Sequence, residues 1–135
     1  MRQFSLFMLM TVGTFKRKIS RVFGLLVDGL CTLIAVPFIL VFRILRPIVW
    51  FRFGYFTSDR IGHFAFDVEH YLTEKKINKG TKSSFDLFFF TGKPANTYFA
   101  DMCRRSMVVH AAIKWLYYAN EILPFSSYHR VLPER

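Results

Sequence analysis

The sequence has little acidic character, few cysteines and no internal repeats. Only 9 of its 135 residues are Asp or Glu, against 19 Lys or Arg, so the net charge is +10. Its two cysteines, Cys31 and Cys103, stand far apart and lack CxxC spacing. This spacing excludes a disulfide framework of the kind found in small secreted domains, and both residues are expected to be reduced core residues of a cytoplasmic protein.

Several common catalytic and metal-binding patterns are also missing. There is no Walker lysine, GxSxG elbow or complete GxGxxG, and residues 80–84 (GTKSS) only partly resemble a phosphate loop and are interpreted as a solvated turn. His63 and His70 lie roughly 10 Å apart along a helix, which is too far for one metal ion. The sequence therefore predicts no metal and no cofactor.

The positive charge is concentrated in the first part of the chain. Residues 1–58 hold eight basic residues against one acid, Asp28. Basic clusters that flank an apolar run indicate an anionic membrane surface as the partner. Nucleic acid is not expected, because its binding needs basic and aromatic groups interleaved on one exposed face, and most aromatics here fall at predicted core positions. The predicted membrane-contacting residues are Lys16, Arg17, Lys18, Arg21, Arg43 and Arg46.

The apolar run covers residues 22–42. A helix of this length would extend roughly 30 Å, which matches a hydrocarbon core. Asp28 within the run and Pro37 near its end instead favour a shallow or re-entrant helix. A narrow polar stripe suits a helix that lies at the interface or packs on a partner, and both this geometry and a full span remain open. The stripe consists of Arg17, Arg21, Asp28, Thr32 and Arg46.

Residues 48–135 alternate between strand and helix patterns. The order indicates a parallel β-α-β-α-β unit, and so few strands leave much apolar surface uncovered. We therefore expect residues 1–47 to form a membrane-associated segment and residues 48–135 to form part of a larger Rossmann-like α/β domain. The predicted elements are strand 48–56, helix 64–75, strand 85–91, helix 97–123 and strand 126–132.

The period changes from strand to helix at residues 57–63, where an α/β fold collects ligand-binding loops. Ser58 or Asp59 is expected to cap the helix, and Arg60 and Gly62 are candidates for binding phosphate at its start. His63 is the candidate catalytic residue, because an imidazole titrates near neutral pH and can act as a general base. The alternative is that His63 packs the loop and that Arg60 is a solvated charge.

Residues 52–72, RFGYFTSDRIGHFAFDVEHYL, resemble a family of bacterial glycosyltransferases found among surface-polysaccharide genes. The resemblance depends mainly on RIGHF at residues 60–64 and extends loosely to Pro124. It implies a two-domain enzyme with paired Rossmann-like halves that binds a nucleotide sugar and a glycan acceptor. The half for the nucleotide sugar is expected to lie outside these 135 residues. In several such enzymes a His after the first strand takes the acceptor hydroxyl proton, and His63 occupies the corresponding place.

The leading hypothesis is thus the N-terminal portion of a membrane-associated glycosyltransferase for surface polysaccharide or lipid-linked glycan, inactive alone. It would sit at the inner membrane with its soluble part in the cytoplasm. The alternative hypothesis is a small, basic, non-enzymatic membrane protein that binds a protein partner.

Overall fold

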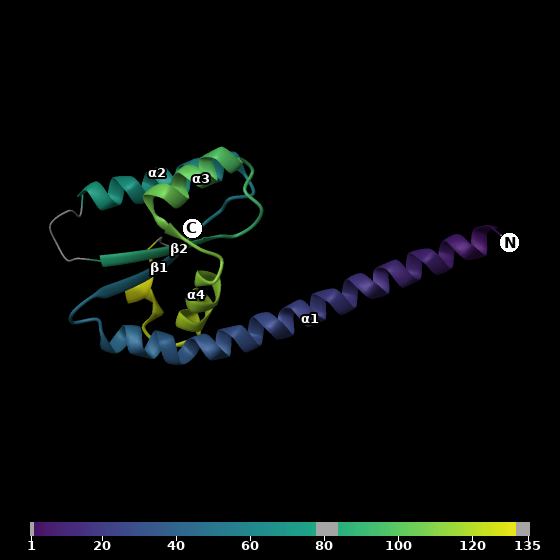
Figure 1. The fold of residues 1–135 in the computed structure, drawn as a ribbon, viewed down its shortest axis with the longest axis horizontal. Helices are drawn as coiled ribbons and strands as arrows, with labels where there is room; N and C mark the ends of the chain where they lie inside the picture. Colours follow the sequence, from purple (N-terminus) through teal and green to yellow (C-terminus); the bar gives the residue numbers. More distant parts are fainter. Residues whose placement is uncertain (1, 78–83, 132–135) are drawn as a thin grey trace.

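The computed structural model describes the backbone of residues 2–77 and 84–131, and the side chains of residues 18–77 and 84–131. The chain is an α/β protein with a parallel sheet covered by helices on both faces (Figure 1). The predicted α/β class and parallel sheet are therefore confirmed. The elements are α1 (Arg2–Ile44), β1 (Trp50–Phe56), α2 (Ile61–Ile77), β2 (Ser84–Phe90), α3 (Thr97–Ser106), β3 (Val108–Val109), α4 (Ile113–Ile122) and the 3-10 turn η1 (Ser126–His129).

The sheet has the order β1-β2-β3, and all its strands run parallel. On the other side of β1, the chain after η1 makes one parallel bridge, between Phe53 and Arg130. The Val131 N–H donates to the Phe53 carbonyl at 3.1 Å. Strand β1 therefore has β2 on one side and the segment around Arg130 on the other.

The predicted long helix 97–123 is wrong. Asn96 caps α3 as expected, its Oδ1 accepting from the Phe99 N–H at 3.0 Å. The helix ends at Ser106, because the next residue, Met107, is extended with φ −141° and ψ 156°. The β-branched pair Val108 and Val109 then pairs with β2, and α4 starts afresh. The segment predicted as one helix is therefore two helices, α3 and α4, which pack on opposite faces of the sheet.

The predicted strand 126–132 is also wrong for most of its length. Residues Ser126–His129 form η1, which follows Phe125 in the left-handed region at φ 63°. Side-chain bonds hold the turn in place. Trp50 Nε1 donates to the Tyr128 carbonyl at 3.0 Å, and His129 Nδ1 lies 2.7 Å from the Phe51 carbonyl. Among the described residues of this segment only Arg130 forms a bridge to the sheet, so the third strand of the sheet is β3; Leu132 lies outside the described residues.

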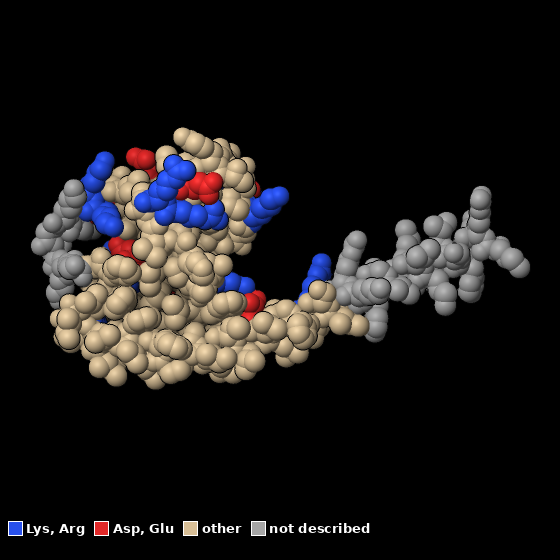
Figure 2. All heavy atoms as spheres, in the orientation of Figure 1, with Lys and Arg blue, Asp and Glu red and all other residues tan. Residues whose placement is uncertain are grey.

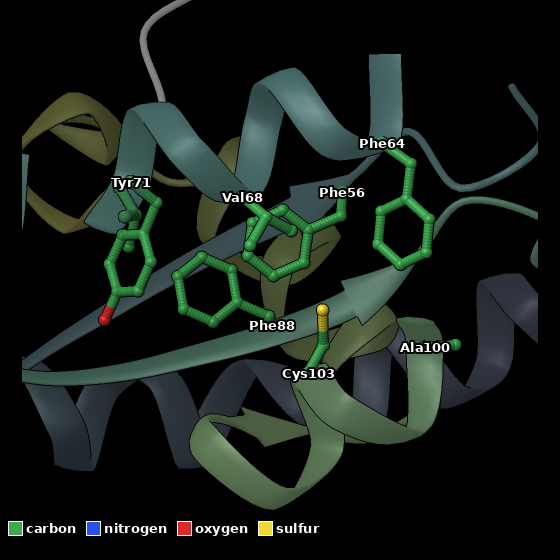
Figure 3. Close-up of a cluster of buried hydrophobic side chains, with 8 residues drawn as sticks. Phe56, Phe64, Val68, Tyr71, Phe88, Ala100 and Cys103 are labelled. Carbon is green, nitrogen blue, oxygen red and sulfur yellow. The ribbon is translucent and has the colours of Figure 1, made fainter. Parts of the chain in front are cut away.

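Side chains of the strands alternate between two apolar cores, one on each face of the sheet. Phe56 and Phe88 stack with ring centroids 4.5 Å apart and pack against side chains of α2 and α3 (Figure 3). Phe53 and Phe89 point to the other face, where α1 and α4 cover them. Both cores are needed because β2 is apolar on both faces.

Helix α1 packs on the α/β body through its C-terminal half and continues through Pro37. Ala35 and Ile39 are buried against the sheet and α4. The Asp28 carboxylate accepts from Lys114 Nζ at 2.8 Å and from Trp115 Nε1 at 3.0 Å. The predicted polar stripe therefore packs on α4 at Asp28, within the same chain.

Gly54 has no side chain, and the Phe88 and Val131 side chains therefore lie close to its backbone. This close packing predicts an effect on stability. A Cβ at Gly54 would lie 2.8 Å from Phe88 Cε1 and 3.2 Å from Val131 Cβ. We expect Gly54→Ala to lower the free energy of unfolding by about 1–3 kcal/mol. Gly62 is the matched control, since a Cβ there would meet nothing within 4 Å.

Urea unfolding in mild detergent, followed by circular dichroism, measures both variants. Gly62→Ala should stay within about 1 kcal/mol of the parent, because alanine is favourable in a helix. Equal stability of the two variants would contradict the close approach at Gly54.

Candidate functional site

The carboxyl ends of the three strands lie at one edge of the sheet, because the strands are parallel. The loops that follow β1, β2 and β3 are therefore neighbours, and open α/β sheets bind their ligands at this edge. The loops are residues 57–60, 91–96 and 110–112.

Ser58 joins the first two loops. Its buried hydroxyl donates to the Gly92 carbonyl at 2.9 Å and accepts from the Gly92 N–H at 3.3 Å. The Ala95 N–H donates to the Ser58 carbonyl at 2.7 Å. Ser58 therefore connects two loops and does not cap α2, which corrects one of the two predicted caps.

A buried carboxylate sets the start of α2 relative to β1. Asp67 Oδ2 accepts from the Thr57 backbone N–H at 2.9 Å, just after the strand ends. The Thr91 N–H and hydroxyl both donate to the Phe56 carbonyl, at 3.1 and 3.3 Å. These bonds fix the loop that carries the predicted site residues.

The predicted site residues lie together at the carboxyl end of β1. Arg60 comes immediately before α2, and Gly62 and His63 belong to its first turn. All three are exposed at this edge of the sheet. Because a Cβ at Gly62 would meet no other atom within 4 Å, no packing contact requires glycine there.

A cavity of about 360 Å³ opens beside these residues on the same edge, at the ends of β2 and β3. The Arg104 guanidinium lies 5.1 Å from the centroid of the Phe90 ring and pairs with Asp101 at 2.8 Å. His110 Nδ1 accepts from the Ala112 N–H at 3.1 Å, so its Nε2 carries the proton in the neutral ring. The cavity is lined by Phe90, Gly92, Pro94, Arg104, Val109, His110 and Ala111.

The sequence prediction missed Arg104 and His110 and did not foresee this cavity. Both residues lie within the predicted helix 97–123, and the sequence analysis assigned them no role. The signal that could have found His110 is the β-branched pair Val108 and Val109 directly before it, because a short strand places the next residue at the ligand-binding edge. Arg60, Gly62 and His63 do not line this cavity.

The basic groups of this edge suit an anionic ligand. Arg60 and Lys93 contribute cationic groups beside one exposed carboxylate, Asp59, and the charge of Arg104 is already paired with Asp101. The amino end of α2 adds the positive end of its helix dipole. Among the described residues there is no cluster of three His, Cys, Asp or Glu that could hold a metal ion.

The opposite edge of the sheet holds an ion pair between the half-buried Arg52 and the buried Asp86. Arg52 binds Asp86 in a bidentate manner, with Nε to Oδ1 at 2.7 Å and Nη2 to Oδ2 at 2.9 Å. Tyr71 donates to Asp86 Oδ2 at 2.9 Å. Burial, followed by the Asp86 charge, raises the pKa of the Tyr71 hydroxyl, so it remains a donor. This pair lies near the amino ends of β1 and β2, away from the loops.

Comparison of the chain with protein-family models, with curated proteins and with solved structures gave no match.

The link made by Ser58 is testable. Ser58→Ala leaves the Gly92 N–H and carbonyl without their buried partner, and we expect it to lower the free energy of unfolding by about 1–3 kcal/mol. Amide hydrogen exchange at Gly92 and Ala95 should become faster. Ser127→Ala, at an exposed position of η1, is the control. Unchanged exchange at both amides would mean that the loops hold together without Ser58.

Proposed function

We propose that this chain is the N-terminal half of a glycosyltransferase that works on a polysaccharide or lipid-linked acceptor at the cytoplasmic surface of the inner membrane. The observation that carries the proposal is the position of RIGHF, residues 60–64. It opens α2 at the carboxyl end of β1, where a parallel sheet offers its ligand site.

The strand order supports a Rossmann-like half. The connections from β1 to β2 and from β2 to β3 run over one face of the sheet, through α2 and α3. The chain then returns over the other face, through α4, to pair beside β1 at Arg130. This reversal makes β1 the boundary between the two directions, and Rossmann folds bind ligands at such a switch point. Residues 57–63 follow β1 at that boundary.

The proposed chemistry uses His63 and Arg60. His63 would take the proton from the attacking hydroxyl of the acceptor as that oxygen bonds to the sugar carbon and the nucleotide leaves. Arg60 and the amides at the start of α2 would hold a phosphate of the substrate. The resemblance implies that a second half holds the nucleotide sugar, so we expect activity only from a chain that carries both halves.

Helix α1 supports the membrane location. Its segment Lys18–Ile44 is the one helical stretch, within the described residues, that is long and apolar enough to cross a membrane. The face turned away from the sheet is exposed and apolar, and Figure 2 shows no basic or acidic side chain along it. Counting about 100° per residue, Arg21, Asp28 and Arg43 all fall on the opposite face. The exposed apolar residues include Ile19, Leu26, Leu30, Leu33, Val41 and Ile44.

The packing of α1 favours a helix in the plane of the membrane over a helix that crosses it. A crossing helix would carry α4, which packs along α1, into the hydrocarbon. The ion pairs of Lys114 with Asp28 and of Arg130 with Glu121 would then also enter the hydrocarbon, and removing these charges from water costs much free energy. A helix lying in the interface buries its outer face and leaves the α/β body in water. The ligand edge then opens just above the membrane surface.

The in-plane orientation predicts equal depths along the outer face of α1. Ile19, Leu33 and Ile44 share that face, and the first and last are about 37 Å apart along the helix. Nitroxide labels on cysteines at these three positions should show the same depth in anionic vesicles by accessibility to oxygen and a nickel chelate. A crossing helix would instead place Leu33 deep and the two ends shallow.

The two native cysteines do not interfere with the labelling. Cys31 is partly exposed and is replaced by Ala, whereas Cys103 is buried, and burial raises the pKa of its thiol. Cys103 should therefore stay unlabelled. Failure of the labelled chain to float with vesicles would favour the alternative, in which a protein partner covers α1.

His63→Ala tests the catalytic assignment in a chain that carries both halves. We expect turnover to fall by about 10²–10⁴-fold with little change in donor affinity, because proton removal matters in the transition state and not in donor binding. His70→Ala, on the body of α2, is the matched control. Near-normal turnover of His63→Ala, or an equal loss in both variants, would remove the catalytic role from His63.

A further inference from the structure

A second cavity, of about 410 Å³, lies near the amino end of β1, away from the ligand edge. It is formed where the last turn of α1 meets η1. Its lining residues come from two parts of the chain that are far apart in sequence: Arg43, Arg46, Phe125, Tyr128 and His129.

Two guanidinium groups face this cavity, and within the described residues neither forms an ion pair. Arg43 donates to the Pro124 carbonyl at 2.6 Å and to Asn120 Oδ1 at 2.9 Å, which are neutral acceptors. Its Nε is buried and has no partner among the described residues. Arg46 lies 5.0 Å from the centroid of the Tyr128 ring. A buried donor without an acceptor and two uncompensated charges fit an anion with several oxygens.

His129 lines the cavity beside the two arginines. Its imidazole can accept a hydrogen bond when it is neutral and donate one when it is charged. The ring is buried, and Nδ1 lies 2.7 Å from the Phe51 carbonyl, which it reaches as the donor. Its other nitrogen, Nε2, is left to accept from a protonated oxygen, or to donate once the ring is charged. Burial, followed by the nearby charges of Arg43 and Arg46, lowers the pKa of His129, although the Phe51 carbonyl acts in the other direction. A bound anion would offset the two arginine charges.

The rim of the cavity is apolar and aromatic. The Phe125 side chain is 75% exposed. Its backbone adopts the left-handed conformation, with φ 63°, which is unfavourable for a residue other than glycine. Tyr128 is also exposed, and Ile44 and Ile48 extend the apolar face of α1 to the same end of the molecule. Exposed aromatic rings beside an apolar surface are typical of the level where lipid headgroups meet the acyl chains.

We propose that this cavity binds the phosphate of an anionic phospholipid headgroup. The assignment uses the proposed in-plane placement of α1, but it does not depend on glycosyl transfer. With the outer face of α1 sunk about 5–10 Å into the interface, groups on its upper side reach the headgroup level. Arg43 and Arg46 would bind the phosphate oxygens, and the acyl chains would leave past Ile44 and Ile48.

The test uses the full chain with soluble, short-chain lipids below their micelle concentration, so that the membrane itself is not needed. Dihexanoyl phosphatidylglycerol should shift the imidazole NMR signals of His129, whereas inorganic phosphate at the same concentration should shift them much less. Arg46→Gln should weaken the lipid binding about tenfold or more, because one charge-assisted contact is lost. Arg105→Gln, at an exposed position of α3, should leave it unchanged.

The outcomes separate this proposal from the others. The Arg46 side chain is exposed and donates no hydrogen bond to the backbone of the described residues, so Arg46→Gln should keep the circular dichroism spectrum of the parent. The second variant, Arg43→Lys, keeps the charge but loses the planar guanidinium with its several donors, and it should also bind the lipid more weakly. Equal binding of phosphate and lipid would overturn the lipid assignment, and binding insensitive to both variants would overturn the site. Short-chain lipid binding without vesicle flotation would refute the in-plane helix while supporting the headgroup site itself.

Discussion

The structure depends on covering both faces of β2. Leu87, Phe88 and Phe89 are all buried, so the strand needs helices above and below it. The upper face receives α2 and α3, which the chain forms between the strands. The lower face receives α4 and the second half of α1, so the helix proposed to meet the membrane is also required by the core. Helix α1 therefore has one apolar face that packs on the sheet and a second apolar face that is exposed on the surface of the molecule.

The double task determines how α1 can meet a lipid bilayer. Burial of Ala35 and Ile39 and the bonds of Asp28 to α4 hold the helix alongside the body, while the opposite face carries exposed leucine and isoleucine. Removing that face from water is favourable by about 25 cal/mol for each Å² of apolar area. Only an orientation parallel to the surface allows this gain without dehydrating the charged groups of α4.

The sequence predicted the local elements well, because each depends on residues close in the chain. Alternating aromatics gave β1 and the apolar run gave β2, and the 3.6-residue spacing of Phe64, Val68 and Tyr71 gave α2. The break at Met107 was missed because Met102, Ile113 and Leu116 share one helical spacing, although Met102 is exposed and only Ile113 and Leu116 pack in a core. The carboxyl edge of β1 was foreseen as the position of Arg60, Gly62 and His63. The cavity at His110 was not foreseen, because it depends on where β3 begins.

The cavity at the base of α1 was beyond sequence reasoning for a related reason. Arg43 binds Asn120 and Pro124, about eighty residues further along the chain, and no local pattern encodes such a contact. Asn120 in turn donates to the carbonyl of Ser126, the first residue of η1, at 3.1 Å. The same segment continues to Arg130 and its pairing with Phe53. Arg43, which faces the proposed headgroup site, is thus connected through Asn120 and η1 to the segment that pairs beside β1. The other end of β1 leads into α2, whose first turn contains His63. The proposed membrane contact and the proposed ligand edge are therefore joined by one continuous set of contacts.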